Sequence, residues 1–242
     1  MMRKDGRLAT SPRPLSFSID YTAHALGSVL VSTGNTRVLC TVTLEEGVPP
    51  WMRGSKPSRG WLNAEYSMLP SATHQRTKRE RSHLGGRTQE IQRLIGRSLR
   101  GIMDFSKCPD YTFVVDCDVL QADGGTRTAS LTGSYVALAI AIKRMLRSGR
   151  LQQNPLKEGL AAISVGIKNE RLLLDIDYEE DSSCDIDMNV VMTHSGRLLE
   201  LQGTAENSSF SREQVNAILD ASLAALTTIK ELQLKAIDSA AN

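Results

Sequence analysis

With 242 residues, of which 40% are hydrophobic, the chain is long enough to form a substantial core as one large domain or two small ones. Its formal net charge of +2, from 29 basic and 27 acidic residues, is too small to indicate a nucleic-acid or membrane partner by bulk attraction. The N-terminus is polar and no run approaches the roughly 18 apolar residues of a membrane span, so we expect a cytoplasmic protein with no membrane contact.

The first section of the chain predicts a β-meander. Turn residues occur at Gly27-Ser28 and at Gly34-Asn35, and they separate three strand-like runs, at residues 17–25, 29–33 and 36–44. Short strands that are close in sequence usually pair with one another. We therefore expect an antiparallel sheet, followed by a long exposed loop over residues 45–60, which is rich in proline, glycine and basic residues.

A helix is predicted from an N-cap at Thr88 to about residue 103. Its apolar side chains recur at helical spacing, at Ile91, Leu94, Ile95, Leu99 and Ile102. Around and along it lies a basic cluster opposed only by Glu80 and Glu90: Arg76, Lys78, Arg79, Arg81, Arg87, Arg93, Arg97 and Arg100. Arginine binds phosphate through paired hydrogen bonds, so the cluster indicates either a nucleic-acid surface or a solvated helix face with a flexible loop.

The stretch QADGGTRTASLTG, residues 121–133, lies between a predicted strand at residues 112–120 and a predicted buried central helix at residues 128–146. A glycine-rich turn that leads into a helix presents unpaired N–H groups and the positive end of the helix dipole. Thr126, Thr128 and Ser130 add hydroxyl groups and Arg127 adds a positive charge. The stretch matches neither the P-loop nor the dinucleotide pattern, which leaves an anion site or a tight strand-to-helix turn.

The third section predicts a second strand-rich region and a final helix. Its strands are expected at residues 162–168, 171–178, 186–193 and 197–201, and the helix begins at Ser211, where Gln214 completes a capping box. Strands followed by helices, twice over, indicate an α+β fold in one domain, residues 1–242, with two related halves at about 1–150 and 151–242.

Seven carboxylates crowd into thirteen positions of this third section: Asp175, Asp177, Glu179, Glu180, Asp181, Asp185 and Asp187. A divalent cation would relieve their repulsion, since Mg²⁺ typically binds one or two carboxylates together with substrate phosphates. An acidic turn in water is the alternative, and it accounts well for Glu179 and Glu180. Asp187 begins the apolar run MNVVMT, so its carboxylate should be partly buried and need a partner.

Five runs of the sequence, in order and along nearly the whole chain, resemble those of the ribonuclease PH family of phosphorolytic exoribonucleases. They are RGWLNAEYSMLPSATHQRTKRE at 59–80, GGRTQEIQRLIGRSLR at 85–100, DCDVLQADGGTRTASLTG at 116–133, LDIDYEEDSSCDIDMNVVMT at 174–193 and ELQGTAE at 200–206. Several long motifs that agree together are much more specific than any one of them.

The resemblance implies a fold of the ribosomal protein S5 domain 2-like class, with two βαβ-type halves, mixed and antiparallel sheets and packed helices. It implies a homohexamer built as a trimer of dimers. The implied reaction is phosphate-dependent 3′-to-5′ trimming of tRNA and other RNA 3′ ends, in which inorganic phosphate is the co-substrate, nucleoside diphosphates are released, and the reverse reaction adds nucleotides.

The resemblance also implies roles for individual residues. The attacking phosphate is held by Arg87, Gly125, Thr126 and Arg127, while Asp181 and Asp187 are the catalytic and metal-binding aspartates for Mg²⁺ or Mn²⁺. Asp187 is expected to be a metal ligand, and Asp181 either a second ligand or the acid that protonates the departing 3′ oxygen. RNA-binding residues are expected at Arg59, Arg76, Arg79, Arg81, Arg93 and Arg97. Many family members carry arginine where this chain has Ser71, so a phosphate or RNA contact there is missing or is supplied by Arg76, Arg79 or Arg81.

Two other functions stay open at this point. A metal-dependent hydrolytic nuclease could use the same aspartates, but it would not need a second anion site at Arg87 and Gly125 to Arg127. A non-catalytic RNA-binding ring subunit would be expected to lack the acidic pair, which this chain retains at Asp181 and Asp187.

Overall fold

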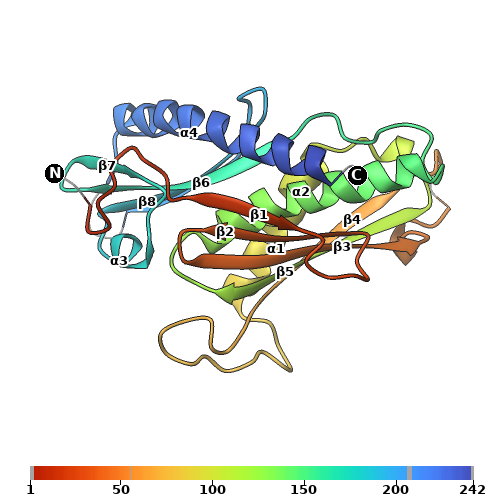
Figure 1. Cartoon of the computed structure of the whole chain (residues 1–242), viewed down its shortest axis with the longest axis horizontal. Coiled ribbons are helices and arrows are strands. Elements are labelled where there is room, and N and C mark those ends of the chain that lie inside the picture. The colour runs from red at the N-terminus through yellow and green to blue at the C-terminus, as the bar shows by residue number, and fades with distance from the viewer. Residues whose placement is uncertain (1–2, 55, 206–208, 241–242) are drawn as a thin grey trace.

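The computed structural model describes residues 3–54, 56–205 and 209–240. Its first sheet has the strand order β1-β2-β3-β5-β4 (Figure 1). The strands are β1 (Leu15–Ile19), β2 (Gly27–Thr33), β3 (Thr36–Glu46), β4 (Trp61–Met68) and β5 (Tyr111–Gln121). All neighbours pair antiparallel except β4 and β5, which are parallel and are joined through helix α1 (Gly86–Gly101). Short 3-10 helices lie at Pro50–Met52, before β4, and at Phe105–Lys107, before β5.

Apolar and polar side chains alternate along the strands of the first sheet, and this alternation decides which face of the sheet is buried. On β5, Phe113, Val115, Cys117 and Val119 are fully or almost fully buried, while the residues between them, such as Asp118, face the other side. The buried face is covered by α1 and by α2 (Thr126–Arg147), which contacts β2 and β3. The sheet therefore turns one face to the helices and leaves the other face uncovered by them.

The predicted central helix is confirmed and begins two residues earlier than expected, at Thr126. It is buried on nearly all sides because it packs on the first sheet and also on β6 of the second sheet and on α4. This position explains why its sequence is apolar all round instead of on one stripe.

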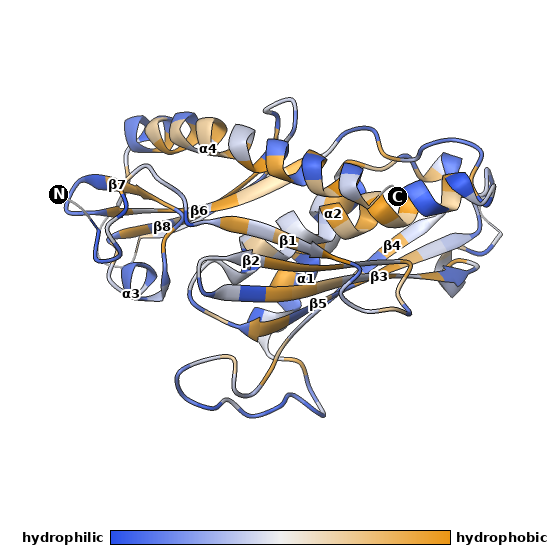
Figure 2. Cartoon of the chain, in the orientation of Figure 1, coloured by the Kyte–Doolittle hydropathy of each residue, from blue (hydrophilic) through white to orange (hydrophobic). Residues whose placement is uncertain are grey.

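The second sheet is antiparallel, with the order β7-β6-β8-β9, and carries its own hydrophobic cluster. Its strands are β6 (Leu160–Lys168), β7 (Arg171–Leu174), β8 (Ile186–Thr193) and β9 (Leu198–Ala205). Helix α4 (Arg212–Ser239) packs on it, with Ile218, Leu226 and Ile229 facing inward, and it begins with the predicted capping box between Ser211 and Gln214. Figure 2 shows α4 alternating between hydrophobic and hydrophilic segments, as an amphipathic helix should.

The mixed α+β class is thus confirmed, with two sheets and four helices in the described residues. That the two halves are duplicates of one another stays a prediction. Within the same described part of the chain, no helix is both long enough and apolar enough to cross a membrane.

Several local predictions were wrong. Gly27-Ser28 is not a turn but the start of β2, and the chain turns before it, where Asp20 adopts a left-handed conformation. Gly27 is needed for close packing, since a Cβ there would lie 2.1 Å from the carbonyl oxygen of Ala137 on α2. Helix α1 begins at Gly86 with Gly85 as its N-cap, not at Thr88.

Two elements were missed. Strand β4 was not predicted, although its burial alternates along Trp61–Met68. The acidic stretch predicted as a loop contains a short helix, α3 (Tyr178–Asp181), with a capping box between Asp177 and Glu180. The strand before it ends at Leu174 instead of residue 178, because Asp175 has a positive φ of 52°.

Candidate active site

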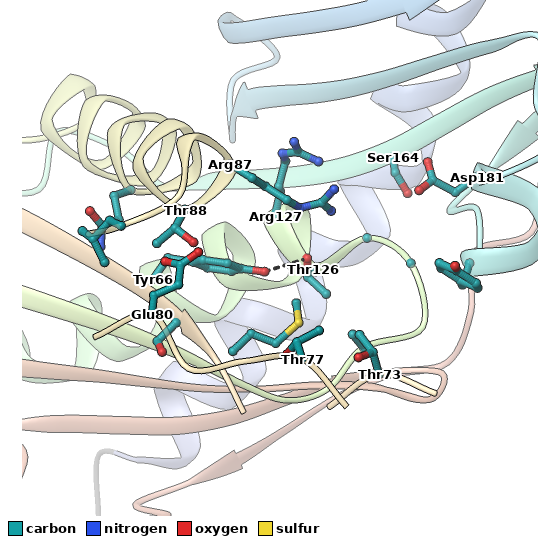
Figure 3. A pocket seen from close by; sticks show the side chains of 18 of the residues that line it. Tyr66, Thr73, Thr77, Glu80, Arg87, Thr88, Thr126, Arg127, Ser164 and Asp181 are labelled. Carbon is teal, nitrogen blue, oxygen red and sulfur yellow. Dashed lines mark hydrogen bonds between the residues drawn. The ribbon is translucent and has the colours of Figure 1, made fainter. Parts of the chain in front are cut away.

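A cavity of about 1030 Å³ lies where the two halves of the molecule meet. Its wall is formed by the end of β4, the segment that follows it, the first turn of α1, the turn between β5 and α2, and residues of β6, α3 and β8 (Figure 3). The structure brings all six predicted phosphate-site and carboxylate residues to this one cavity: Arg87, Gly125, Thr126, Arg127, Asp181 and Asp187.

The turn between β5 and α2 depends on two glycines. Gly124 and Gly125 have φ angles of 73° and 64°, a left-handed conformation that other residues adopt only with strain. A Cβ at Gly124 would also lie 2.5 Å from the backbone of Asp177. No side chain caps the N-terminus of α2 behind this turn, so its first N–H groups are suited to an anion.

A buried ion pair holds the turn from behind. The guanidinium of Arg13 forms two hydrogen bonds to the carboxylate of Asp175, at 2.6 and 3.0 Å, and both side chains are over 90% buried. The same guanidinium donates to the carbonyl oxygens of Asp123 and Gly124, the latter at 3.4 Å. Thr36 also donates to the carbonyl of Gly124, at 2.7 Å. These donors fix the orientation of the peptide groups that lead into α2.

On the cavity side of the turn, Arg87 comes from the first turn of α1 and Arg127 from the first turn of α2, and both side chains reach into the cavity (Figure 3). Arg127 donates to Glu90 at 2.8 Å. Burial acts to raise the pKa of the Glu90 carboxyl, but hydrogen bonds from Arg127 and Gln202 outweigh it and hold this pKa below its ordinary value. Glu90 therefore stays ionised at neutral pH and fixes one edge of the Arg127 guanidinium.

Tyr66 fixes the first residue of α2. Its hydroxyl donates to the Thr126 hydroxyl at 3.0 Å, drawn as a dashed line in Figure 3. Burial raises the pKa of Tyr66, so the phenol stays protonated and remains a donor. Thr126 is thereby held in place beside the two arginines.

The seven clustered carboxylates divide into two groups by their position relative to the cavity. Five lie outside its wall: Asp175 binds Arg13, Asp177 caps α3, Glu179 binds Lys4, Glu180 binds Arg3, and Asp185 accepts from the Asn169 amide. The remaining two, Asp181 at the end of α3 and Asp187 near the start of β8, line the cavity. Asp187 is partly buried, as its place in an apolar run predicted.

The donor set suits a cation that takes few protein ligands. Among the described residues, no group of three or more His, Cys, Asp or Glu side chains is placed to hold a metal ion. Two carboxylates are enough for Mg²⁺, because it typically takes one or two carboxylates from a protein, keeps several waters and binds substrate phosphates as well. Asp181 and Asp187 fit this requirement.

The predicted RNA-binding arginines are divided by the structure. Arg79 lines the cavity, together with Lys78, which was not among the predicted site residues. The other five do not line it: Arg59, Arg76, Arg81, Arg93 and Arg97. Arg76 and Arg81 lie in the exposed loop between β4 and α1 (Figure 1), and Arg97 on α1 pairs with Glu200 at 3.3 Å. Ser71 is exposed and also lies outside the cavity wall.

Sequence reasoning missed several residues of the site. Arg13 received no role, and Asp175 was counted only as one carboxylate of the acidic run. Tyr66 and Asn189 line the cavity from strands β4 and β8. A buried tyrosine or asparagine in an apolar run gives a weak signal, because its function depends on which distant residues it meets.

Comparison with known proteins agrees with the motifs. Domain 1 of the 3′ exoribonuclease family matches residues 11–143, and domain 2 of that family matches residues 160–225. The chain is 55% identical over 221 residues to ribonuclease PH of Bacillus subtilis, covering 90% of this chain and 89% of that protein. The chain belongs to the 3′ exoribonuclease family. Ribonuclease PH of Bacillus velezensis is 52% identical, with 96% of this chain and 95% of that protein covered.

These similarities confirm the predicted resemblance and support a phosphorolytic 3′ exoribonuclease, an enzyme of the nucleotidyltransferase class with phosphate as a substrate. Two solved structures share the fold at a TM-score of 0.79. Rice (Oryza sativa) Rrp46 is 21% identical, and the match covers 97% of this chain and 100% of that chain. The Archaeoglobus fulgidus exosome with RNA bound to the active site is 23% identical, and the match covers 95% of this chain and 92% of that chain. They confirm the predicted fold class.

Proposed function

We propose that this chain trims the 3′ ends of tRNA and other RNA by phosphorolysis in the cavity described above. The observation that carries the proposal is the meeting, in one cavity, of an anion site at Arg87 and Gly125 to Arg127 with the carboxylates of Asp181 and Asp187. Phosphoryl transfer requires mainly positioning and charge stabilisation, which these two groups can supply together.

In the proposed reaction, an oxygen of inorganic phosphate attacks the phosphorus of the last phosphodiester. A new P–O bond forms, the bond from phosphorus to the 3′ oxygen of the preceding nucleotide breaks, and a nucleoside diphosphate leaves. Arg87, Arg127 and the N-terminus of α2 hold and orient the attacking phosphate and balance its charge.

The carboxylates serve the leaving side of the same reaction. Asp187 would hold Mg²⁺ or Mn²⁺, and Asp181 would be either a second ligand or the acid that delivers a proton to the departing 3′ oxygen. When bound, the cation supplies positive charge that offsets the charge of the phosphates in the transition state.

We propose that the RNA is held by Arg59, Arg76, Arg79, Arg81, Arg93 and Arg97. The loop between β4 and α1 is exposed and basic, which suits contact with the phosphate backbone. One such loop is short compared with a tRNA, so a homohexamer that combines loops of several subunits would gain avidity. Its place of action would be the cytoplasm.

Digestion of a tRNA with a short 3′ extension, in Mg²⁺ and with or without inorganic phosphate, tests the proposal. Nucleoside diphosphates released only with phosphate support it. Monophosphates released in phosphate-free buffer would indicate hydrolysis, and no release under either condition would indicate a subunit that only binds RNA.

A further inference from the structure

Three serine hydroxyls are buried with no hydrogen-bond partner in the described part of the chain. They belong to Ser98 on α1, Ser164 on β6 and Ser222 on α4, which are 2%, 3% and 0% exposed. A buried polar group without a partner is uncommon and costs free energy, so each calls for a reason. Of these three, only Ser164 lines the cavity.

Ser164 lies between the turn at Gly125, which we propose binds phosphate, and the carboxylate of Asp181. A Cβ placed on Gly125 would lie 3.5 Å from the Ser164 hydroxyl oxygen, which locates that oxygen beside the anion-binding turn. On its other side, Figure 3 shows the Ser164 hydroxyl and the Asp181 carboxylate pointing toward one another. Across the sheet Ser164 pairs with Asn189, which also lines the cavity.

Packing alone does not require a hydroxyl at this position. β6 reads LAAI before Ser164 and VGIK after it, and all of these residues except the terminal Lys168 are buried. Alanine would fill nearly the same volume there without leaving a polar atom to satisfy. The hydroxyl is therefore explained best by a ligand in the cavity.

We propose that the Ser164 hydroxyl donates a hydrogen bond to a phosphate oxygen of the substrate, on the side of the anion site that faces Asp181. This inference rests on the proposed function. A neutral donor suits the position, since lysine or arginine there would pair with the aspartate instead of the substrate. The phosphate oxygen belongs either to the attacking inorganic phosphate or to the scissile phosphodiester.

The test compares Ser164→Ala with Ser98→Ala and Ser222→Ala, which remove equally buried and unpartnered hydroxyls away from the cavity. Each protein is assayed for phosphorolysis of a 3′-extended tRNA, with inorganic phosphate and RNA varied separately. The rise in melting temperature caused by phosphate alone is measured as well. We expect Ser164→Ala to lower kcat/KM by roughly tenfold, as for loss of one hydrogen bond to a charged group, with a melting temperature at or above that of the parent.

The two sources of the phosphate oxygen give different results. A contact with inorganic phosphate predicts a higher KM for phosphate and a smaller phosphate-induced rise in melting temperature. A contact with the phosphodiester predicts lower activity at every phosphate concentration, with the same phosphate-induced rise in melting temperature as in the parent. Ser164→Cys replaces the hydroxyl by a slightly larger thiol that fills the site but donates weakly, so its activity should stay low. Recovery of activity in this variant would assign Ser164 a packing role and overturn the inference.

The outcomes separate this inference from the function on which it rests. Parental activity in Ser164→Ala, while the parent itself releases nucleoside diphosphates, would overturn the inference alone. A parental protein that releases no nucleoside diphosphate would refute the proposed function and the inference with it.

Discussion

The turn between β5 and α2 and the loop between β4 and α1 both carry arginine that we propose binds phosphate, but the two segments are built in different ways. The turn is held by the buried Arg13–Asp175 pair, by Thr36 and by contact with the backbone of Asp177. The loop is exposed along nearly its whole length. A preorganised site loses no order when it binds one small anion, whereas an exposed loop can adapt to a large and variable RNA.

This difference predicts how each region responds to change. Substitution within the rigid site should affect catalysis strongly, because hydrogen bonds hold the groups of that site in position and catalysis depends on that position. Substitution in the loop should affect RNA affinity in small, salt-dependent steps.

The largest effect is expected at the carboxylates. Asp187→Asn keeps the shape of the side chain but removes the charge that would hold the cation, so kcat should fall on the order of 10²- to 10³-fold. The assay is single-nucleotide release from 3′-extended tRNA. Asp185→Asn is the matched control, since Asp185 lies outside the cavity wall and accepts from the Asn169 amide. An Asp187→Asn protein with parental activity would contradict the site assignment.

Removal of the buried arginine should affect both stability and phosphate binding. Arg13→Met leaves Asp175 as an uncompensated buried charge, and we expect a loss of about 3–5 kcal/mol in the free energy of unfolding, measured by urea denaturation. The KM for phosphate should also rise, because the carbonyls of Asp123 and Gly124 lose their donor.

The double variant Arg13→Met with Asp175→Leu separates these two effects. It should recover much of the stability, since both charges are removed, but not the affinity for phosphate. Recovery of both would mean that Arg13 serves stability alone.

In the exposed loop, Arg76→Ala and Arg81→Ala, which both lie outside the cavity wall, should each weaken tRNA binding several-fold and reduce the slope of log affinity against log salt by about 1. Binding is measured at several salt concentrations. Arg171→Ala, on the exposed start of β7 outside the cavity wall, is the control. A larger loss of kcat than of affinity would place the loop arginines in the chemical step instead.

The smallest effect concerns Glu90. Because its folded-state pKa lies below the ordinary value of 4.5, its ion pair with Arg127 contributes stability above that pH and loses it as the pH falls through the lowered pKa. The melting temperature of Glu90→Gln should therefore be slightly below that of the parent at neutral pH, and the difference should vanish on acidification. A difference that grew as the pH fell would contradict this sign.

The sequence permitted prediction of the residues that carry strong local patterns. The glycine-rich turn, the buried α2 and the two aspartates were all identified, because they lie in motifs with their own local chemistry. Arg13 could not be identified, since its partner Asp175 is 162 positions away and the segment around it has no periodic pattern. Ser164 lies inside an apolar strand and becomes notable only when its unpartnered hydroxyl is seen in the cavity wall beside Gly125.

The wrong prediction at Gly27 and the missed strand β4 have a similar physical cause. Gly27 was interpreted as a turn residue, although it permits close approach of α2, and that contact is tertiary. Strand β4 was missed because its parallel partner, β5, follows only after α1. In both cases the deciding interaction joins segments that are distant in sequence.

The central claim is that inorganic phosphate held at Arg87 and Arg127 becomes part of the product. It is tested most directly by digesting a 3′-extended tRNA in the presence of isotopically labelled inorganic phosphate. We predict one labelled phosphate in each released nucleoside diphosphate, and loss of this labelled product in Asp187→Asn. Release of unlabelled nucleoside monophosphates by the parental protein would contradict it.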